Sequence, residues 1–147
     1  MAIKKGFTLV ELIIVIIIVG ILASLGLTQY SLVVEKSRLV EAKIRIGDMR
    51  QLAYGYYSEG GAMDGMQNSD VGGDTVCTSS SFFSCAYEGI PGPGGVYLSC
   101  RRCTSLGKSP NTSKQYVFYM NYYPATGTST WHCSYVDTGA GCFGFSP

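Results

Sequence analysis

The fold of this chain is decided by residues 4–27, which read KKGFTLVELIIVIIIVGILASLGL. Within this stretch, residues 7–27 carry one charged side chain, that of Glu11. At about 1.5 Å per helical residue such a run spans roughly 30 Å, the thickness of a bilayer's hydrocarbon core. Lys4 and Lys5 precede the run, so the positive-inside rule places the N-terminus in the cytoplasm. The sequence therefore predicts a membrane-spanning helix followed by an exported domain.

The composition of the whole chain limits what the exported part can be. A length of 147 residues leaves room for one modest domain and an appendage. Lys and Arg number 11 and Asp and Glu number 10, and the formal net charge of +1 argues against nucleic acid as a general partner. Charged residues make up 14% of the chain and hydrophobic residues 46%, which fits neither a disordered chain nor an ordinary soluble domain.

Three kinds of apolar segment have this length: a plain membrane anchor, a secretory signal peptide cut after its apolar core, and an anchor that later leaves the bilayer. Glu11 favours the third kind, because an ionised carboxylate at the centre of a spanning helix costs about 2.5 to 3.5 kcal/mol and needs a partner. The small residues Ala23, Ser24 and Gly26 offer a cleavage site, so the signal peptide stays open as an alternative.

The segment KKGFTLVE at residues 4–11, with the aliphatic run after it, resembles the leader and first residues of a type IV prepilin. In that family a prepilin peptidase cuts after the glycine on the cytoplasmic side and N-methylates the new N-terminus. The resemblance implies that residues 1–6 are a leader, that cleavage follows Gly6, and that the mature chain begins at Phe7. It also implies an inner-membrane location before assembly, an inner-membrane pilus assembly machinery as partner, and a helical homopolymer on the cell surface afterwards.

In the prepilin family, a glutamate at the position of Glu11 is thought to meet the terminal amine of a neighbouring subunit. Electrostatics agrees with this role, since cleavage creates a cationic amine at Phe7, about 6 Å along the helix axis from Glu11. Each charge is costly alone in a low-dielectric helical bundle, and a neighbour that brings the two together relieves both and sets the register. A Glu11 that stays hydrated near the cytoplasmic headgroups is the alternative.

Small residues in the apolar run bear on how helices pack during subunit assembly. Gly20 and Ser24 form a small-xxx-small pair, which favours close approach of two helices. Many members of the prepilin family carry a proline where this chain has Thr28, and that proline is associated with a kink or local melting. Gly20 and Gly26 each weaken a helix by about 1 kcal/mol relative to Ala, so local stretching near Gly20 to Thr28 stays open.

From Tyr30 onward the pattern changes from apolar on all sides to apolar on one side, which is typical of a half-buried helix. The apolar stripe consists of Leu32, Leu39, Ala42, Ile46, Met49, Ala53 and Tyr56. Glu41 and Arg45 stand in the order that suits an i,i+4 ion pair. The first helix-ending signal is SEGG at residues 58–61, so we expect one helix over residues 7–57.

Residues 58–147 are expected to form a small head on this helix. Residues 58–95 are rich in Gly and Ser and show no helical period, which predicts a long loop. Residues 96–147 predict a small antiparallel β-meander, with strand-like runs at 96–100, 115–123, 129–136 and 142–145. With its apolar face on the helical stripe, the meander completes an α+β fold, which the resemblance also implies.

All six cysteines lie in the exported part, and an even number in an oxidising compartment predicts three disulfides among 15 possible pairings. The expected pairs are Cys133 with Cys142, Cys77 with Cys85, and Cys100 with Cys103. The first pair straddles the last turn, as C-terminal disulfides do in many pilins. The second pair closes the long loop, and the third is what remains.

No arrangement of residues predicts an active site, a cofactor or a metal. Cys100 and Cys103 have the CxxC spacing of a redox pair or of half a zinc site, but a redox motif opens a helix beside a parallel strand. The exported location favours structural disulfides over zinc. His132 is the one histidine, and no nucleophile stands near it in the sequence in a recognisable catalytic set. We therefore expect a protein that is not an enzyme.

The charges of the head are segregated along the sequence. The acidic stretch contains Glu59, Asp64, Asp70, Asp74 and Glu88, and the basic stretch contains Arg101, Arg102, Lys108 and Lys114. We expect acids such as Asp70 and Asp74 to meet Arg101 and Arg102 of a neighbouring subunit in a head-to-tail contact, which is the kind that builds open filaments. Solvated surface charge on both stretches is the alternative.

Together these features predict a structural protein, a major type IV pilin subunit whose filament serves adhesion, motility or DNA uptake. A type II secretion pseudopilin shares the N-terminus, but the well-known major form is usually cysteine-poor and has an acidic calcium-binding loop near the C-terminus. A minor pilin that binds a ligand or DNA through Arg101 and Arg102 is a further alternative. A secreted cysteine-rich binding module with a signal peptide is the last.

Overall fold

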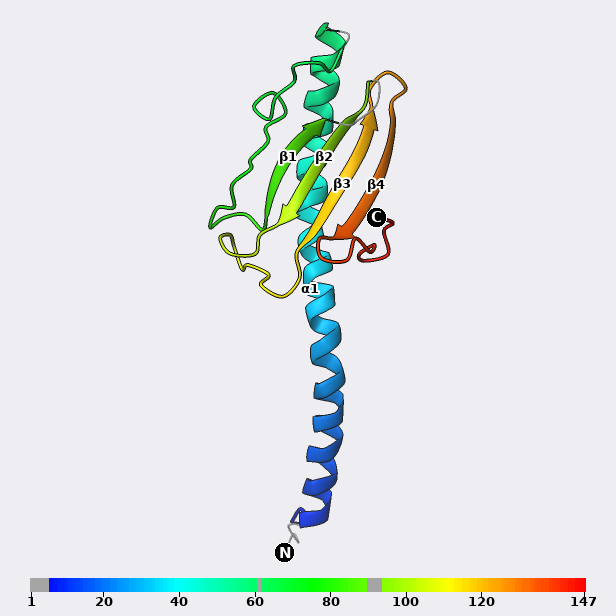
Figure 1. The fold of residues 1–147 in the computed structure, drawn as a ribbon. Coiled ribbons are helices and arrows are strands. Elements are labelled where there is room, and N and C mark those ends of the chain that lie inside the picture. The colour runs from blue at the N-terminus through cyan, green and yellow to red at the C-terminus, as the bar shows by residue number, and fades with distance from the viewer. Residues whose placement is uncertain (1–5, 61, 90–93) are drawn as a thin grey trace, which may run out of the picture. The chain divides into compact units, whose positions relative to one another are not determined.

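One helix and four strands make up the part of the chain that the structure describes (Figure 1). The computed structural model describes residues 6–60, 62–89 and 94–147, without the side chain of Thr28. Residues 1–5 of the expected leader, with Lys4 and Lys5, and positions 61 and 90–93 of the expected loop lie outside the described residues. The chain divides into two compact units, residues 1–37 and 38–147.

The helix α1 (Leu9–Gly60) passes through both units and lies within a few residues of the range 7–57 that the sequence predicts. Its sequence contains no proline, so every backbone N–H beyond the first turn can bond to the carbonyl four residues earlier. The predicted apolar stripe is buried from Leu39 to Ala53 and half-buried at Tyr56, whereas Leu32, in the first unit, is 45% exposed. The half-buried part of the helix is therefore shorter than the stripe suggests.

The head, residues 38–147, contains the second part of α1 and an antiparallel sheet in the order β1-β2-β3-β4. The strands are β1 (Phe83–Gly89), β2 (Val96–Arg102), β3 (Tyr116–Tyr123) and β4 (Thr128–Tyr135). A turn joins β3 to β4, in which Gly127 N–H donates to Pro124 C=O at 3.3 Å and Gly127 has φ +69°. The α+β meander predicted from the sequence is confirmed.

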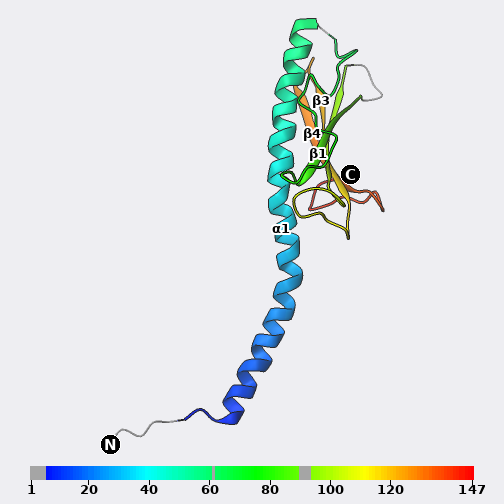
Figure 2. The same cartoon turned by 90° about the vertical axis from the view of Figure 1, so that its left-hand side faces the viewer.

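One face of the sheet packs on the second part of α1 (Figure 2). The buried residues of α1 lie at helical spacing and face alternate residues of the strands. The core is Leu39, Ala42, Ile46, Met49 and Ala53 from α1, with Phe83, Cys85, Val96, Leu98, Cys100, Tyr116, Phe118, Met120 and Tyr122 from the first three strands, and Cys133 from β4. Met63, Met66 and Val71 of the following segment and Cys142 near the C-terminus complete it.

The prediction of a loop over residues 58–95 is wrong for its last part, because β1 lies within this range. In β1, Phe83 and Cys85 are fully buried and Ser84 and Ala86 are half-buried, which is the alternation of a strand with one face on a core. Its short, Ser- and Gly-bounded sequence carries little of the β-branched signal that marks a strand. Pairing with β2 along seven residues supplies what local propensity lacks.

The prediction of a strand over residues 142–145 is also wrong. Phe143 has φ +54° and Gly144 has φ +88°, and left-handed backbone at two successive residues cannot continue a β-ladder. The segment instead returns to β4 through one isolated bridge, between Ser134 and Gly141, and a hydrogen bond from Cys142 N–H to Cys133 C=O at 3.1 Å.

All six cysteines form disulfides, and one of the three expected pairs is confirmed. Cys133 bonds to Cys142, as predicted. The pairs Cys77 with Cys85 and Cys100 with Cys103 are wrong, because Cys77 bonds to Cys103 and Cys85 to Cys100. The register of β1 and β2 explains the difference, since it places Cys85 directly opposite Cys100 with their Cα atoms 4.1 Å apart.

Candidate functional site

The start of α1 is a capping box formed by Thr8 and Glu11. Thr8 Oγ1 accepts a hydrogen bond from Glu11 N–H at 3.3 Å, and Glu11 Oε2 accepts from Thr8 N–H at 2.9 Å and from Thr8 Oγ1 at 2.8 Å. Gly6 and Phe7 precede the box and are exposed. The role of Thr8 is not among the sequence predictions, although the S/T-x-x-E pattern at residues 8–11 was sufficient to find it.

The apolar run after the capping box has no protein covering. The large apolar side chains from Leu9 to Leu27 are 41–74% exposed. Within the described residues, α1 is the one helix long and apolar enough to cross a membrane, by length and composition. A continuous apolar surface of this size needs lipid or other protein around it.

Gly20 and Ser24 lie within this uncovered run. A Cβ added at Gly20 has open space around it, and Ser24 Oγ donates to Ile21 C=O at 2.8 Å. The hydroxyl of Ser24 is therefore satisfied inside its own helix, as is usual for serine in an apolar setting. Both positions are compatible with the close approach of a second helix.

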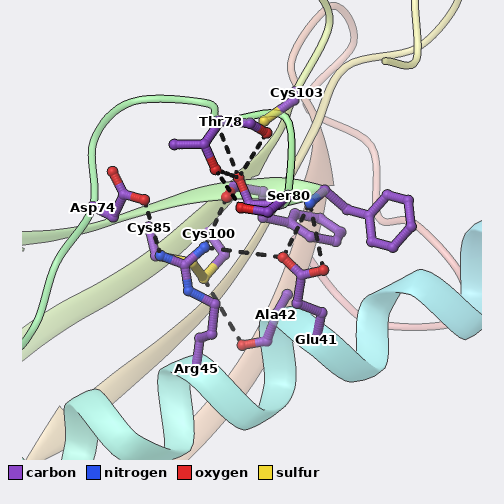
Figure 3. Close-up of polar contacts among 12 residues, drawn as sticks. Glu41, Ala42, Arg45, Asp74, Thr78, Ser80, Cys85, Cys100 and Cys103 are labelled. Atoms are coloured by element: carbon purple, nitrogen blue, oxygen red, sulfur yellow. Dashed lines mark hydrogen bonds and ion pairs between the residues drawn. A yellow bond between two sulfur atoms is a disulfide. The ribbon is translucent and has the colours of Figure 1, made fainter. Parts of the chain in front are cut away.

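In the head, α1 is joined to the start of β1 by a polar cluster built on Glu41 and Arg45 (Figure 3). The Glu41 carboxylate accepts from Phe82 N–H at 3.1 Å, and Arg45 Nη1 donates to Phe83 C=O at 2.8 Å. Arg45 also lies 4.0 Å from Glu41, as the i,i+4 spacing predicts, and 3.8 Å from Asp74. The pair fixes the position of β1 on the helix.

The prediction that Arg102 meets a neighbouring subunit is wrong, because its side chain is fully buried. Its guanidinium donates to three carbonyl oxygens, those of Phe82 at 2.9 Å, Ser109 at 2.6 Å and Cys103 at 3.3 Å. It also stacks 5.6 Å from the centroid of the Phe82 ring. Arg102 is therefore a structural residue that holds the β2–β3 loop.

The other three predicted intersubunit charges lie at separate places. Arg101 is exposed on the sheet face that points away from α1. Asp70 accepts from Gln67 N–H at 2.7 Å within its own loop, and Asp74 faces Arg45. No contact within the described residues joins these acids to Arg101, and two of the charges already have partners in the head.

The outer face of the sheet carries a row of stacked rings, one from each of three strands. Tyr97 and Tyr119 have ring centroids 4.6 Å apart, and Tyr119 and His132 have centroids 5.0 Å apart with ring planes 15° from parallel. Burial raises the pKa of Tyr97 well above its usual range, with smaller contributions from Tyr119 and Glu88. Burial also raises the pKa of Tyr119.

His132 is held by this row and by hydrogen bonds, since Nε2 lies 3.1 Å from Thr130 Oγ1 and Nδ1 lies 3.1 Å from Pro147 C=O. The disulfides already engage Cys100 and Cys103, so their CxxC spacing is neither a redox pair nor half of a zinc site. In the part of the chain that the structure describes, no three His, Cys, Asp or Glu residues are grouped so as to hold a metal ion.

Comparison with known proteins agrees with the features of the N-terminal segment. Residues 1–27 match the family model described as the prokaryotic N-terminal methylation motif. Fimbrial protein EcpC of Eikenella corrodens is 27% identical over 132 residues, which cover 90% of this chain and 83% of the relative. A type IV major fimbrial protein FimA of Dichelobacter nodosus is 34% identical over 101 residues, 66% of this chain and 62% of the relative. A second FimA protein of that organism is 31% identical over 104 residues, 67% of this chain and 64% of the relative. No solved structure has a significant match to the chain.

Proposed function

Because this chain belongs to the type IV pilins, the structural subunits of pili, we propose that its mature form begins at Phe7 and polymerises through the apolar part of α1. The observation that carries the proposal is the uncovered run from Leu9 to Leu27 on a helix whose other end is built into a disulfide-bonded head. A helix of this kind can be held by a membrane first and by copies of itself afterwards.

Processing is proposed to take place between Gly6 and Phe7, by a prepilin peptidase that also methylates the new N-terminus. Both residues precede the first helical residue, Leu9, and both are exposed, which suits access by an enzyme. Cleavage removes Lys4 and Lys5 with the leader, so the basic residues fall from 11 to 9 against 10 acids, and the formal charge becomes −1. The new amine at Phe7 adds a positive charge next to the capping box.

Glu11 is proposed to pair with the Phe7 amine of a neighbouring subunit. Its contacts to Thr8 both use Oε2, which leaves Oε1 without a partner among the described residues. A carboxylate held in one rotamer by the capping box is preorganised to receive a cation. Once surrounded by apolar side chains, the amine and the carboxylate stabilise each other and penalise any other register.

Packing between the helices is proposed to use Gly20 and Ser24. Lipid and helix interiors are about equally apolar, so transfer from membrane to filament gains little hydrophobic free energy. Association then depends on close packing at small residues and on the Glu11 pair. The subunit is proposed to wait in the inner membrane, to be extracted by the inner-membrane assembly machinery, and to end in an extracellular filament.

Electron microscopy of cells that express the chain with a prepilin peptidase and a pilus assembly system tests this function. We expect surface filaments that contain the chain, and none from the variant Gly6→Leu, because the large side chain blocks cleavage. Ala2→Leu, a matched change within the expected leader, should leave filaments intact. A chain found only in the medium as a monomer, or filaments built from the uncut Gly6→Leu variant, would contradict the proposal.

A further inference from the structure

From the two ends of the head we infer that copies of this chain dock head to tail. The basic loop of one copy, which is the β2–β3 loop at residues 103–115, packs on the acidic end of another copy, which is formed by Tyr56, Glu59, Gly60, Ala62 and Asp64. The contact pairs Lys108 and Lys114 with Glu59 and Asp64. This inference rests on the proposed function, since it describes a contact between subunits of the filament.

The basic loop and the acidic end lie at opposite ends of the head (Figure 1). The guanidinium of Arg38 lies 5.0 Å from the Phe82 ring, and Lys108 Nζ lies 5.2 Å from the same ring, so the loop is level with the beginning of the head's helix. The guanidinium of Arg50 lies 5.9 Å from the Tyr122 ring, near the other end of the sheet. The helix continues past this level to Gly60.

The basic loop is held rigidly, although it has no regular structure. Its backbone is fixed by the Cys77–Cys103 disulfide, by Arg102 donating to Ser109 C=O at 2.6 Å, and by Lys108 N–H donating to Ser81 C=O at 2.8 Å. Such a loop loses little conformational entropy when it binds. Its side chains remain available, since Lys108 and Lys114 are exposed and Leu106 is 65% exposed.

The acidic end offers a complementary surface. A hollow of about 300 Å³ is lined by Tyr56, Glu59, Gly60, Ala62 and Asp64. The carbonyl end of α1, where the helix dipole is negative, lies here, and the last turn as described has no basic residue to offset it. Within the described residues neither Glu59 nor Asp64 has an ion pair, and the sequence has no Lys or Arg between Arg50 and Arg101.

A second copy of the chain is the occupant that these observations favour. Subunits that repeat along a filament in one orientation bring the basic loop of one head to the acidic end of another head. The two ends then carry opposite charge, which favours this contact and disfavours two like ends meeting. The exposed Leu106 beside the lysines adds an apolar contact for the wall of the hollow, where Tyr56 and Ala62 lie.

The test is a charge swap in the full chain. One variant carries Lys108→Glu with Lys114→Glu, and another carries Glu59→Lys with Asp64→Lys. We expect each variant to lower the amount of sheared filament at least tenfold. We expect the variant with all four changes to restore it. Asp48→Lys reverses an exposed charge elsewhere on α1 and should leave the filament yield unchanged. Intact mass and Trp131 fluorescence of the membrane-bound subunit show whether each variant is still processed and folded.

Carbodiimide treatment of wild-type filaments, which joins a lysine amine to a neighbouring carboxylate, gives a second measurement that needs no variant. We expect cross-linked peptides that join Lys108 or Lys114 to Glu59 or Asp64 of another copy. Normal yield from the paired reversals, or no recovery in the fourfold variant, would overturn the inference. Lysine variants that assemble normally but lose salt-dependent DNA binding would assign the loop to a polyanion instead. Wild-type cells without any filament would instead count against the proposed function.

Discussion

The first part of α1 exposes its apolar side chains, whereas the head buries those of its core. From Leu9 to Leu27 every large apolar side chain is exposed, whereas the core residues of the head, such as Ile46 and Leu98, are fully buried. The head completes a core within one chain and locks it with three disulfides. The first part of α1 leaves its apolar surface to be covered by other molecules. The chain thereby separates a head that completes its own core from a helical segment whose surface is covered only by lipid or by other protein.

The largest effect that separates the two regions is expected for Glu11→Ala. Removing the carboxylate leaves a neighbour's Phe7 amine without a counter-charge in an apolar bundle, so we expect the amount of sheared filament to fall at least tenfold. The thermal unfolding of the head, followed by the fluorescence of Trp131 in detergent-solubilised protein, should not change. Asp48→Ala, an exposed acid on α1 within the head, is the matched control and should assemble normally. A Glu11→Ala variant that assembles at the wild-type level would contradict the pairing.

The next effect belongs to the head and is expected for the double change Cys77→Ser with Cys103→Ser. This disulfide encloses the Cys85–Cys100 bond, so with that bond intact it closes a loop of only about 13 residues, for which the loop-entropy model gives a loss of about 2.9 kcal/mol in the free energy of unfolding. The Cys133–Cys142 bond closes a separation of 9 and should cost about 2.7 kcal/mol by the same model, so we expect nearly equal losses. Denaturant unfolding of the solubilised chain, followed at Trp131, measures both. Losses that differ by more than about 1 kcal/mol would show that strain or native contacts dominate.

A similar loss is expected for Arg102→Met, because the methionine fills much of the volume but leaves buried carbonyl oxygens without donors. We expect the free energy of unfolding to fall by about 2 to 3 kcal/mol. Arg101→Met, next to it on the exposed face, should change stability by no more than about 0.5 kcal/mol. Denaturant unfolding followed at Trp131 measures the free energy of unfolding of both variants. If the Arg101 variant were the less stable one, the assignment of the two arginines would be reversed.

The smallest effect is the pH dependence of the head. The pKa of Tyr97 is raised by burial, so the neutral phenol is favoured in the folded head more than in the unfolded chain. This contribution to stability is fully present below about pH 10, the usual tyrosine pKa, and is lost as the pH rises through the higher folded value. Tyr97→Phe should therefore reduce the fall in melting temperature between pH 9 and pH 11. Tyr30→Phe, at an exposed position outside the head, is the control, and an equal reduction there would contradict this role for Tyr97.

The two regions also differ in how far the sequence predicts them. The apolar helix follows from composition and from the short-range pattern around Gly6 and Glu11, because a helix needs only neighbours along the chain. The pairing of Cys85 with Cys100 depends on the register of β1 and β2. β1 itself is not predicted from the sequence, because its segment lacks strong strand-forming residues. Burial of Arg102 depends on where the β2–β3 loop folds back, which spacing does not reveal.

The capping box at Thr8 could be predicted from the sequence, whereas the left-handed backbone of Phe143 and Gly144 could not. The capping box follows from a local rule, since threonine and glutamate stand at the required spacing. The left-handed backbone does not, because CFGF reads as a strand by composition, and the Cys133–Cys142 disulfide turns the chain back on β4. Long-range covalent and hydrogen-bonded constraints override local propensity at that point.

The most direct test of the central claim is the intact mass and N-terminal sequence of the chain recovered from sheared cell-surface material. We expect a chain that starts at Phe7, is one methyl group heavier than the unmodified sequence from Phe7, and lacks the six hydrogens removed by three disulfides. A chain that starts near Leu27 would instead be a secreted protein released from a signal peptide. An uncut chain starting at Met1 would be a fixed membrane anchor, and either result would contradict the proposed function.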